Sequence, residues 1–381
     1  MINIKNNFLN KKNSLKVIIE NNAPSFFIVG YYFFYLFYLQ NPSEVPFLSI
    51  ASVFLILSLV WIFFVKKIYK KDKFIIACMF VMTIGYFLQV YFIKNRSFVF
   101  FILVATYFSL GLLIIKSKLN INIMKFSFIV HVLFFSIHII IGDNPNELFS
   151  ISQNVISSIM MVQCTIVYIS EYQNGKNITI LPALITVLIS AWAGGRAGFL
   201  CSLLILFSVI IFSKNKKEIT IGKIMFIVSL SIVLLVLIKF VFSDFFIQIL
   251  NRLTDQGIVD SVRSELIERY FYRISLEDII LGRNLAFDPL YRFVSLNTHN
   301  SYLQLHAIYG LFGIIAIFFG LIKQISIYIK SKNFLLLFIL ITILIRIFSE
   351  THAFTNFMDP IIYWLIFNYN CQKEDITNEI L

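Results

Sequence analysis

Charged residues are scarce in this sequence. Asp, Glu, Lys and Arg together make up 14% of its 381 residues, whereas soluble globular domains contain about 25%. Hydrophobic residues reach 59%, and 43 residues are phenylalanine. This composition excludes an ordinary soluble globular protein and indicates a chain that crosses a membrane several times.

Cysteine is also rare, and the four cysteines follow no recognisable pattern. Cys78, Cys164, Cys201 and Cys371 lie far apart, and no C-x-x-C pair occurs. Neither a disulfide framework nor a metal site is therefore expected. Internal repeats, low-complexity tracts and a soluble domain are also absent from the sequence, so we expect a single integral membrane domain over residues 1–381.

Long apolar runs fill most of the chain instead. A helix needs about 20 mostly apolar residues to cross a hydrocarbon core of about 30 Å. The sequence therefore predicts an all-α polytopic membrane protein with about 12 transmembrane helices. The expected spans lie at about 24–40, 47–65, 74–93, 97–115, 123–142, 155–170, 178–193, 197–213, 222–242, 299–322, 333–349 and 354–370.

Lysine and arginine divide between the two sides of the membrane. Alternate threading of the loops places 21 of 23 lysines on one side, which the positive-inside rule identifies as cytoplasmic. Both termini are then cytoplasmic, and the longest loop, about residues 243–298 between spans 9 and 10, lies outside. The net charge of +12 is thus a signal of topology, so the expected partner is the lipid bilayer and no nucleic acid is expected.

All nine arginines fall outside or near the outer ends of spans, which favours an anion-binding outer face. A guanidinium is a planar fork that binds phosphate or carboxylate through two hydrogen bonds. A genome biased towards lysine is the alternative explanation. Arg196 follows Gly194 and Gly195, which are expected to turn the chain between spans 7 and 8. It would then lie at a helix N-terminus, where free N–H groups favour an anion.

The outer loop contains one predicted helix, over residues 261–281. Leu266, Tyr270 and Ile274 recur at intervals of four residues, which is typical of an amphipathic helix at a membrane surface. Arg263, near the start of this helix, is a second candidate anion-binding residue.

Two further arginines are expected on the other face of the same helix. Arg269 and Arg273 lie four residues apart and are candidate substrate-binding residues. The same spacing is also explained by a solvent-exposed helix face on which Glu265 contacts Arg269. We favour this second interpretation for Arg269 and Arg273.

Titratable side chains occur at the start of the tenth span and in the last outer turn. His299 and Asn300 begin the tenth span, and an imidazole there is a candidate general base because it accepts a proton near neutral pH. In the last outer turn Arg346 and Glu350 are expected to pair at a spacing of four residues. Glu350 and His352 are weaker candidates for the site than His299.

Together these segments resemble the O-antigen ligase and O-antigen polymerase family of bacterial envelope glycosyltransferases. The resemblance rests on "GGRAGFL", on the outer-loop helix from Arg263 to Gly282, and on "HNSYLQLHAIYG" at the start of the next span. It covers about residues 185–320 and the overall plan of spans. The arginine turn departs from the commoner form of the family, in which serine precedes the arginine and glycine follows it.

The resemblance implies an inverting glycosyl transfer that needs no metal and no other cofactor. Members of the family use a glycan on undecaprenyl pyrophosphate at the outer face of the bacterial inner membrane. A polymerase adds this glycan to a lipid-linked repeat unit, whereas a ligase transfers it to the lipid A core. The composition and the short outer loop favour a polymerase, and a chain-length regulator and a flippase of the same pathway are candidate partners.

The resemblance also assigns roles to individual residues. Arg196 and Arg263 are expected to contact the pyrophosphate, and His299 to accept the proton of the acceptor hydroxyl or to orient it. Asn300 is expected to bind sugar hydroxyls. A transporter or flippase is the competing class, but spans 1 to 4 carry few ionisable groups away from their ends. A scaffold whose arginines bind anionic lipid is the third.

Overall fold

The computed structural model describes residues 22–41, 45–64, 72–93, 98–149, 152–212, 261–294 and 296–369. These residues are predominantly helical, and none of them lies in a strand. Within these described ranges, five helices are long and apolar enough to cross a membrane, so the chain is a helical membrane protein. These five are Pro46–Phe64, Lys73–Ile93, Ile121–Ile141, Asn154–Gln173 and Ser301–Lys330.

The helices follow one another with short connections wherever both neighbours are described. A first helix covers residues 22–40. The labelled elements are α2 (Val45–Phe64), α3 (Lys73–Ile93), α4 (Phe98–Lys116), α5 (Ile121–Ile141), α6 (Pro145–Leu148), α7 (Asn154–Gln173), α8 (Leu181–Ala193), α9 (Arg196–Phe212), α12 (Ser261–Phe271), α13 (Leu276–Leu281), η2 (Leu285–Phe287), α14 (Pro289–Phe293), α15 (Ser301–Lys330), α16 (Phe334–Phe348) and α17 (Asp359–Phe367).

Eleven of the twelve predicted stretches coincide with helices. The ninth, residues 222–242, lies outside the described residues, as does the predicted outer loop before residue 261. The helices α8, α9, α16 and α17 are shorter than a straight crossing requires. The number of spans therefore stays a prediction.

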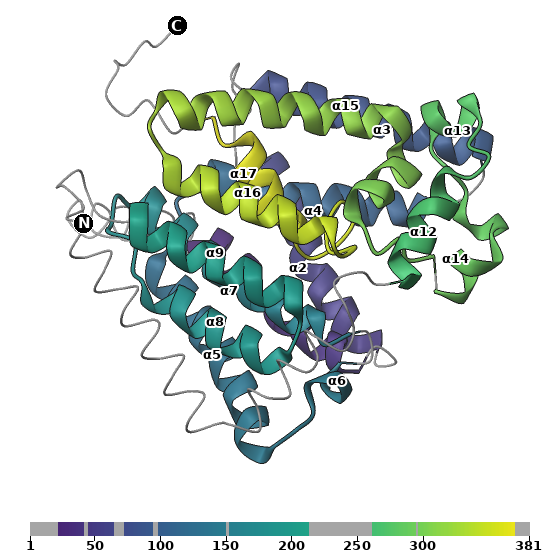
Figure 1. Cartoon of the computed structure of the whole chain (residues 1–381). Helices are drawn as coiled ribbons and strands as arrows, with labels where there is room; N and C mark the ends of the chain where they lie inside the picture. The colour runs from purple at the N-terminus through teal and green to yellow at the C-terminus, as the bar shows by residue number, and fades with distance from the viewer. Residues whose placement is uncertain are drawn as a thin grey trace, which may run out of the picture.

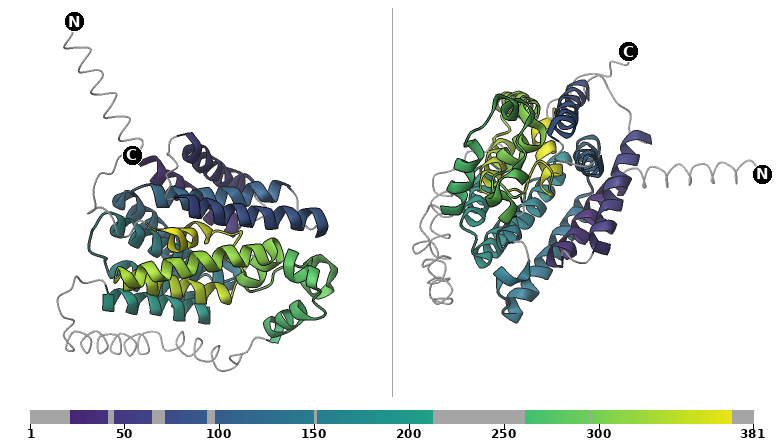
Figure 2. Two further views of the ribbon diagram at one scale, coloured as in Figure 1. Left: turned by 90° about the horizontal axis from the view of Figure 1, so that it is seen from above. Right: turned by 90° about the vertical axis from the view of Figure 1, so that its right-hand side faces the viewer.

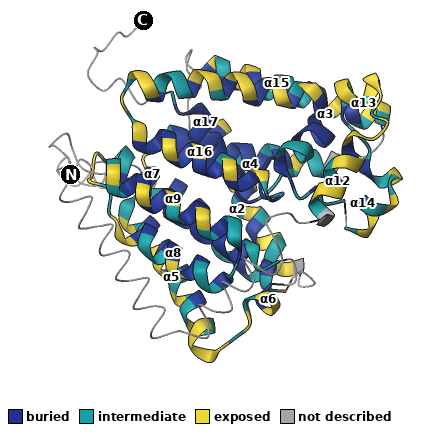
Figure 3. Cartoon of the chain, viewed as in Figure 1, coloured by how far each residue is buried: buried dark blue, intermediate teal, exposed yellow. Residues whose placement is uncertain are grey.

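α7 lies in the interior of the bundle, among α5, α8 and α9 (Figure 1). This helix packs against α5, α8 and α9, and every residue from Val155 to Glu171 is buried. All residues of α17 are buried as well. In contrast, α2, α3, α5 and α15 expose large hydrophobic side chains on their outer surfaces (Figure 3). Exposed apolar surface on the peripheral helices is expected where lipid surrounds a bundle.

The segment α12–α14, residues 261–294, lies at one end of the bundle beside the start of α15 (Figures 1 and 2). We call it the end segment. Its small apolar core consists of Leu266, Tyr270, Leu285, Tyr291 and, from α15, Ala307. The end segment lies at one end of the bundle, and we call this end the site end.

The prediction of one continuous helix over 261–281 is wrong. α12 ends at Phe271, Arg273 takes a left-handed φ of 51°, and α13 begins after Ser275. Ser275 and Asp278 form a capping box that starts the new helix. Arg269 and Arg273 therefore do not share a helix face.

A kink at Gly310 divides α15, within the predicted span 299–322. Gly310 has φ 60° and ψ −153°, a conformation that only glycine adopts readily. A Cβ atom at this position would also clash with the carbonyl oxygen of Ile280. The glycine is thus needed both for the bend and for the close approach of α13.

Candidate functional site

Arg196 lies where the sequence predicts it. α8 ends at Ala193, Gly194 takes a left-handed φ of 70°, and Arg196 is the first residue of α9. Its side chain is half-buried. The N-terminal position of this arginine is therefore confirmed, and the free N–H groups of the first turn add to its positive charge.

Two glycines bring the start of α9 against the start of α7. A Cβ atom on Gly195 would clash with Oδ1 of Asn154, and one on Gly198 would clash with Oγ of Ser157. No larger residue fits at either position without a shift of the helices. The Arg196 turn is therefore held next to Asn154.

Glu350 is the centre of the site. Its Oε1 accepts hydrogen bonds from Nδ2 of Asn154 (2.7 Å) and from an NH2 group of Arg263 (2.8 Å). Its Oε2 faces Nδ1 of His299 at 3.9 Å. We call these four residues the Glu350 cluster. Together they join α7, α12, the start of α15 and the loop between α16 and α17.

The carboxyl group of Glu350 is held in its charged form. Burial by itself raises the pKa of Glu350 because a charge loses its hydration. The positive charges of the nearby Arg346 and Arg263 outweigh this effect, and the pKa lies at about 2. The site therefore keeps its single carboxylate ionised across the physiological pH range.

His299 has a strained backbone conformation and a partly exposed side chain. Its φ is 48°, a left-handed value that is uncommon for a residue other than glycine, and its N–H donates to Oδ1 of Asn297 (2.8 Å). Among the described residues Nδ1 finds no hydrogen-bond partner, since 3.9 Å is too long for a hydrogen bond with Glu350. The side chain is 31% exposed, so the ring is accessible to a bound molecule.

The loop that carries His299 is tied to the loop that carries Glu350. Oγ of Ser301 donates to the carbonyl oxygen of Glu350 (2.5 Å) and accepts from the N–H of Ala353 (3.2 Å). Oγ1 of Thr351 donates to Oδ1 of Asn297 (2.6 Å). These bonds fix the relative position of the imidazole and the carboxylate.

Asn300 has a structural role as the N-cap of α15. Its buried side chain caps α15, because Oδ1 accepts from the N–H groups of Tyr302 and Leu303. The contact of Asn300 with sugar hydroxyls remains a prediction. Because Oδ1 is used in the cap, the Nδ2 group would have to make that contact.

Arg346 does not form the predicted pair with Glu350. It is completely buried, and its two NH groups donate to Oγ of Ser349 and to the carbonyl oxygen of Asn154, each at 2.9 Å. The spacing of four residues fails because α16 ends at Phe348, before Glu350. The carboxylate is thereby left to Arg263, which comes from a distant part of the chain.

His352 is a buried neutral neighbour of the cluster. Its Nδ1 lies 2.8 Å from Oγ of Ser158 on α7. Burial lowers the pKa of His352 to about 3, against the opposing effect of the negative charge of Glu350. The ring therefore adds no charge to the site near neutral pH.

The starts of four helices converge on the Glu350 cluster. Asn154 begins α7, Arg196 begins α9, Arg263 lies in the first turn of α12, and Asn300 caps α15. Each helix start contributes a partial positive charge. With the guanidinium groups of Arg263 and Arg346 close to the single carboxylate of Glu350, the site carries net positive charge and suits a multiply charged anion.

The other outer arginines stand apart from this cluster. Arg269 and Arg273 are exposed, and the guanidinium of Arg273 lies 5.2 Å from the ring centroid of Tyr272. Arg283 binds the carbonyl oxygens of Arg269 and Tyr270 and so caps the C-terminus of α12. Arg96 and Arg252 lie outside the described residues. Binding of substrate by Arg269 and Arg273 stays a prediction.

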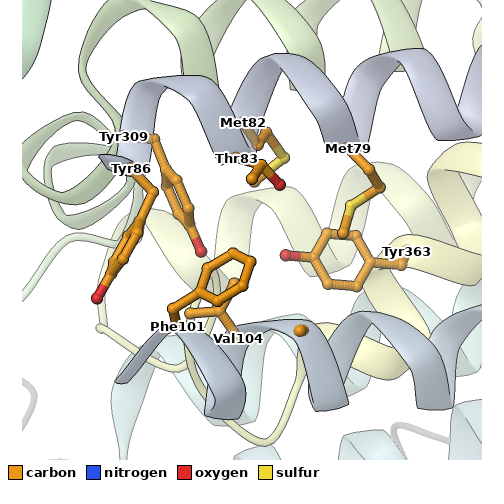
Figure 4. A pocket seen from close by; sticks show the side chains of 9 residues that line it. Met79, Met82, Thr83, Tyr86, Phe101, Val104, Tyr309 and Tyr363 are labelled. Atoms are coloured by element: carbon orange, nitrogen blue, oxygen red, sulfur yellow. The ribbon is translucent and has the colours of Figure 1, made fainter. Parts of the chain in front are cut away.

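A small cavity in the bundle offers a different environment (Figure 4). Tyr309 and Tyr363 point into it from α15 and α17. Its lining consists of Met79, Met82, Thr83, Tyr86, Phe101, Val104, Ala105, Tyr309 and Tyr363. It contains no charged side chain and therefore does not suit a pyrophosphate. In the described part of the chain, no three His, Cys, Asp or Glu side chains are grouped as ligands of a metal ion.

The sequence did not predict the central position of Glu350 or its contact with Asn154. No local pattern marks either residue. Glu350 contacts Asn154 across 196 residues of sequence and Arg263 across 87. Comparisons with protein-family models, with curated proteins and with solved structures find no match for this chain.

Proposed function

We propose that this chain is a glycosyltransferase of the bacterial envelope that acts on lipid-linked glycans. In this proposal it is a polymerase of O-antigen or a similar surface polysaccharide, and it moves a glycan from undecaprenyl pyrophosphate to a lipid-linked repeat unit. The observation that supports it is the grouping of Arg263, His299 and the Arg196 helix start around Glu350 at one end of the bundle.

The arginines stabilise the leaving group in this proposal. As the bond between the anomeric carbon and the phosphate oxygen breaks, its electron pair moves to the pyrophosphate, whose negative charge rises. Arg196 and Arg263 hold this charge together with the starts of α9 and α12. Arg263 is suited to this role because its side chain is fixed by Glu350 and still 30% exposed.

His299 accepts the proton of the acceptor. The hydroxyl oxygen attacks the anomeric carbon on the face opposite the pyrophosphate, which inverts the configuration, while the hydroxyl proton passes to the imidazole. Glu350, 3.9 Å away, favours the imidazolium that forms because opposite charges attract across a short distance. No nucleotide sugar and no metal takes part in this scheme.

The proposed topology places this chemistry outside the cytoplasm. About 12 spans, with the lysine-rich loops and both termini in the cytoplasm, put the start of α15 and the end segment at the outer face of the inner membrane. The donor is exposed at this face, so the site end would meet the pyrophosphate at the level of the lipid headgroups.

Turnover by the purified protein tests the proposal. The protein is reconstituted with an undecaprenyl-pyrophosphate-linked glycan as both donor and acceptor, without an ion gradient. We expect longer lipid-linked glycans and release of undecaprenyl pyrophosphate, and loss of both products with His299→Ala. The matched control is Arg292→Ala, since Arg292 is exposed on α14 away from the cluster.

Other outcomes separate the alternatives. Product that forms only when lipid A core is the acceptor identifies a ligase. Movement of the lipid-linked glycan across the bilayer without new glycosidic bonds identifies a transporter, and absence of both activities leaves the scaffold.

A further inference from the structure

α3 provides a depth scale for the site end of the bundle. Its apolar stretch, residues 74–93, is about 30 Å long at 1.5 Å per residue, the thickness of a hydrocarbon core. Lys73 precedes this stretch and Lys94 follows it. Ile93 therefore marks the membrane boundary at the site end.

Two contacts give the level of α15 on this scale. Nε2 of Gln89 donates to the carbonyl oxygen of Ala307 (2.9 Å), and a Cβ atom on Gly85 would clash with the carbonyl oxygen of Tyr309. Gln89 and Gly85 lie four and eight residues before Ile93, which corresponds to about 6 and 12 Å along the helix. This part of α15 is therefore inside the leaflet.

α13 meets α15 at that depth. Gly310 is in such close contact with the carbonyl oxygen of Ile280 that a Cβ atom would clash with it. The chain then returns to the boundary, where Nδ2 of Asn284 donates to the carbonyl oxygen of Ile93 (3.4 Å). Residues 275–284 thus enter the leaflet and leave it on the same side.

Hydrogen bonds pair main-chain groups of this segment and the buried histidine beside it, as a hydrocarbon environment requires. Nε2 of His306 donates to the carbonyl oxygen of Ile279 (2.9 Å), and Nδ1 of the same ring accepts from the hydroxyl of Tyr270 (2.6 Å). The N–H of Gly282 donates to the carbonyl oxygen of Asp278 (2.9 Å). The histidine thereby joins the segment to α15 and is occupied at both nitrogens.

The surface that α13 turns away from the bundle carries an exposed charged side chain, Glu277, in its first turn and is otherwise mostly apolar. Leu276 is 73% exposed, Ile279 41% and Ile280 39%. Ile314, on the outer surface of α15 one turn beyond the kink, is exposed to the same extent as Ile280. Water would make this exposure unfavourable, whereas acyl chains would cover it.

From depth, backbone pairing and apolar surface together, we infer that residues 275–284 form a re-entrant segment embedded in the leaflet at the site end, with lipid acyl chains as its partner. The end segment is then anchored in the bilayer, and Arg263 is held at a fixed height above it.

Nitroxide labels on single cysteines test this placement. The full chain, with its four native cysteines replaced by alanine, is reconstituted in phosphatidylcholine bilayers. EPR power saturation then compares collisions with oxygen, which concentrates in lipid, and with a nickel chelate, which stays in water. We expect the oxygen-to-nickel ratio to be severalfold higher for labels at Ile279→Cys and Ile280→Cys than at Glu268→Cys, an exposed position on α12.

Ile314→Cys is the matched lipid-facing control because its exposed fraction equals that of Ile280. Ratios at Ile279 and Ile280 close to that of Ile314 support the inference, and ratios equal to that of Glu268 overturn it. If a label at Ile280 prevents folding, Leu276→Cys decides in the same way, since this side chain is the most exposed of the three. The result does not depend on transferase activity.

Discussion

Arg263 donates a 2.8 Å hydrogen bond to Glu350 across 87 residues of sequence. Arg263 belongs to the end segment, and Glu350 belongs to the loop between α16 and α17. The same carboxylate oxygen holds Asn154 at the start of α7. One side chain thus couples three parts of the site, and its substitution is expected to affect position and charge together.

Glu350→Gln and Glu350→Ala should separate these two effects. Gln keeps an oxygen that can accept from Asn154 but lacks the negative charge beside Arg263 and His299. We expect a folded protein whose proposed transfer is slower by about 100-fold or more. Ala also removes the hydrogen bonds, and it should lower the free energy of unfolding by about 2 kcal/mol. Turnover and thermal unfolding in detergent measure the two effects.

Glu268→Gln is the control for both Glu350 variants because Glu268 is exposed on α12. It should change neither quantity. Full turnover by Glu350→Gln would exclude any role for the carboxylate charge.

His352 gives the stability a distinct dependence on pH. Burial lowers the pKa of His352 to about 3, whereas a histidine in an unfolded chain titrates near about 6.5. As the pH falls below this value, the unfolded state binds a proton that the folded state does not. The free energy of unfolding should then drop by up to about 1.4 kcal/mol per pH unit.

Unfolding of the natural protein and of His352→Gln between pH 7 and pH 4 measures this slope. Gln can still bond to Ser158 but has no proton to gain, so the variant should lose less stability in acid. Equal slopes for the two proteins would show that another group is responsible.

The contact between Gly198 and Ser157 predicts a rescue. Gly198→Ala forces α9 away from α7, and it should lower the free energy of unfolding by about 1–3 kcal/mol and move Arg196 from its place. Ser157→Gly removes the side chain that would clash. The double variant should therefore be more stable than Gly198→Ala alone. Thermal unfolding of the four proteins forms the test, and strictly additive losses would argue against the contact.

Arg196 should tolerate lysine poorly in the proposed reaction. Lysine keeps the charge but cannot present a planar fork to a phosphate. We expect Arg196→Ala to abolish turnover and Arg196→Lys to retain a small part of it, with normal thermal unfolding of both variants. Arg292→Ala serves again as the control. Turnover of Arg196→Lys equal to that of the natural protein would reduce the role of Arg196 to that of a point charge.

The positions of the helices were largely predictable from the sequence, because apolar runs of sufficient length mark them regardless of how they pack. The place of Arg196 was predictable for a local reason too, since two consecutive glycines favour a turn. The break after α12 also had a local signal: Ser275 and Asp278 stand at the spacing of a capping box. The four-residue periodicity of Leu266 and Tyr270 concealed it.

The grouping around Glu350 was not predictable in the same way. Asn154, Arg263 and Glu350 meet only because α7, α12 and the last loop share one end of the bundle. Glu350 was expected to pair with Arg346, its neighbour in sequence. Whether Glu350 pairs with the near Arg346 or with the distant Arg263 depends on how the helices pack. The spacing of residues in the sequence does not predict that packing.

The convergence of four helix starts means that much of the attraction for an anion resides in the main chain. Peptide N–H groups are supplied by any residue except proline, so this part of the attraction does not come from the arginine side chains. A shift of one of these helices would weaken this attraction even where every arginine is kept. For a designer who wishes to place an anion site in a membrane bundle, the arrangement of helix ends is accordingly the first choice to make, and the choice of cations is the second.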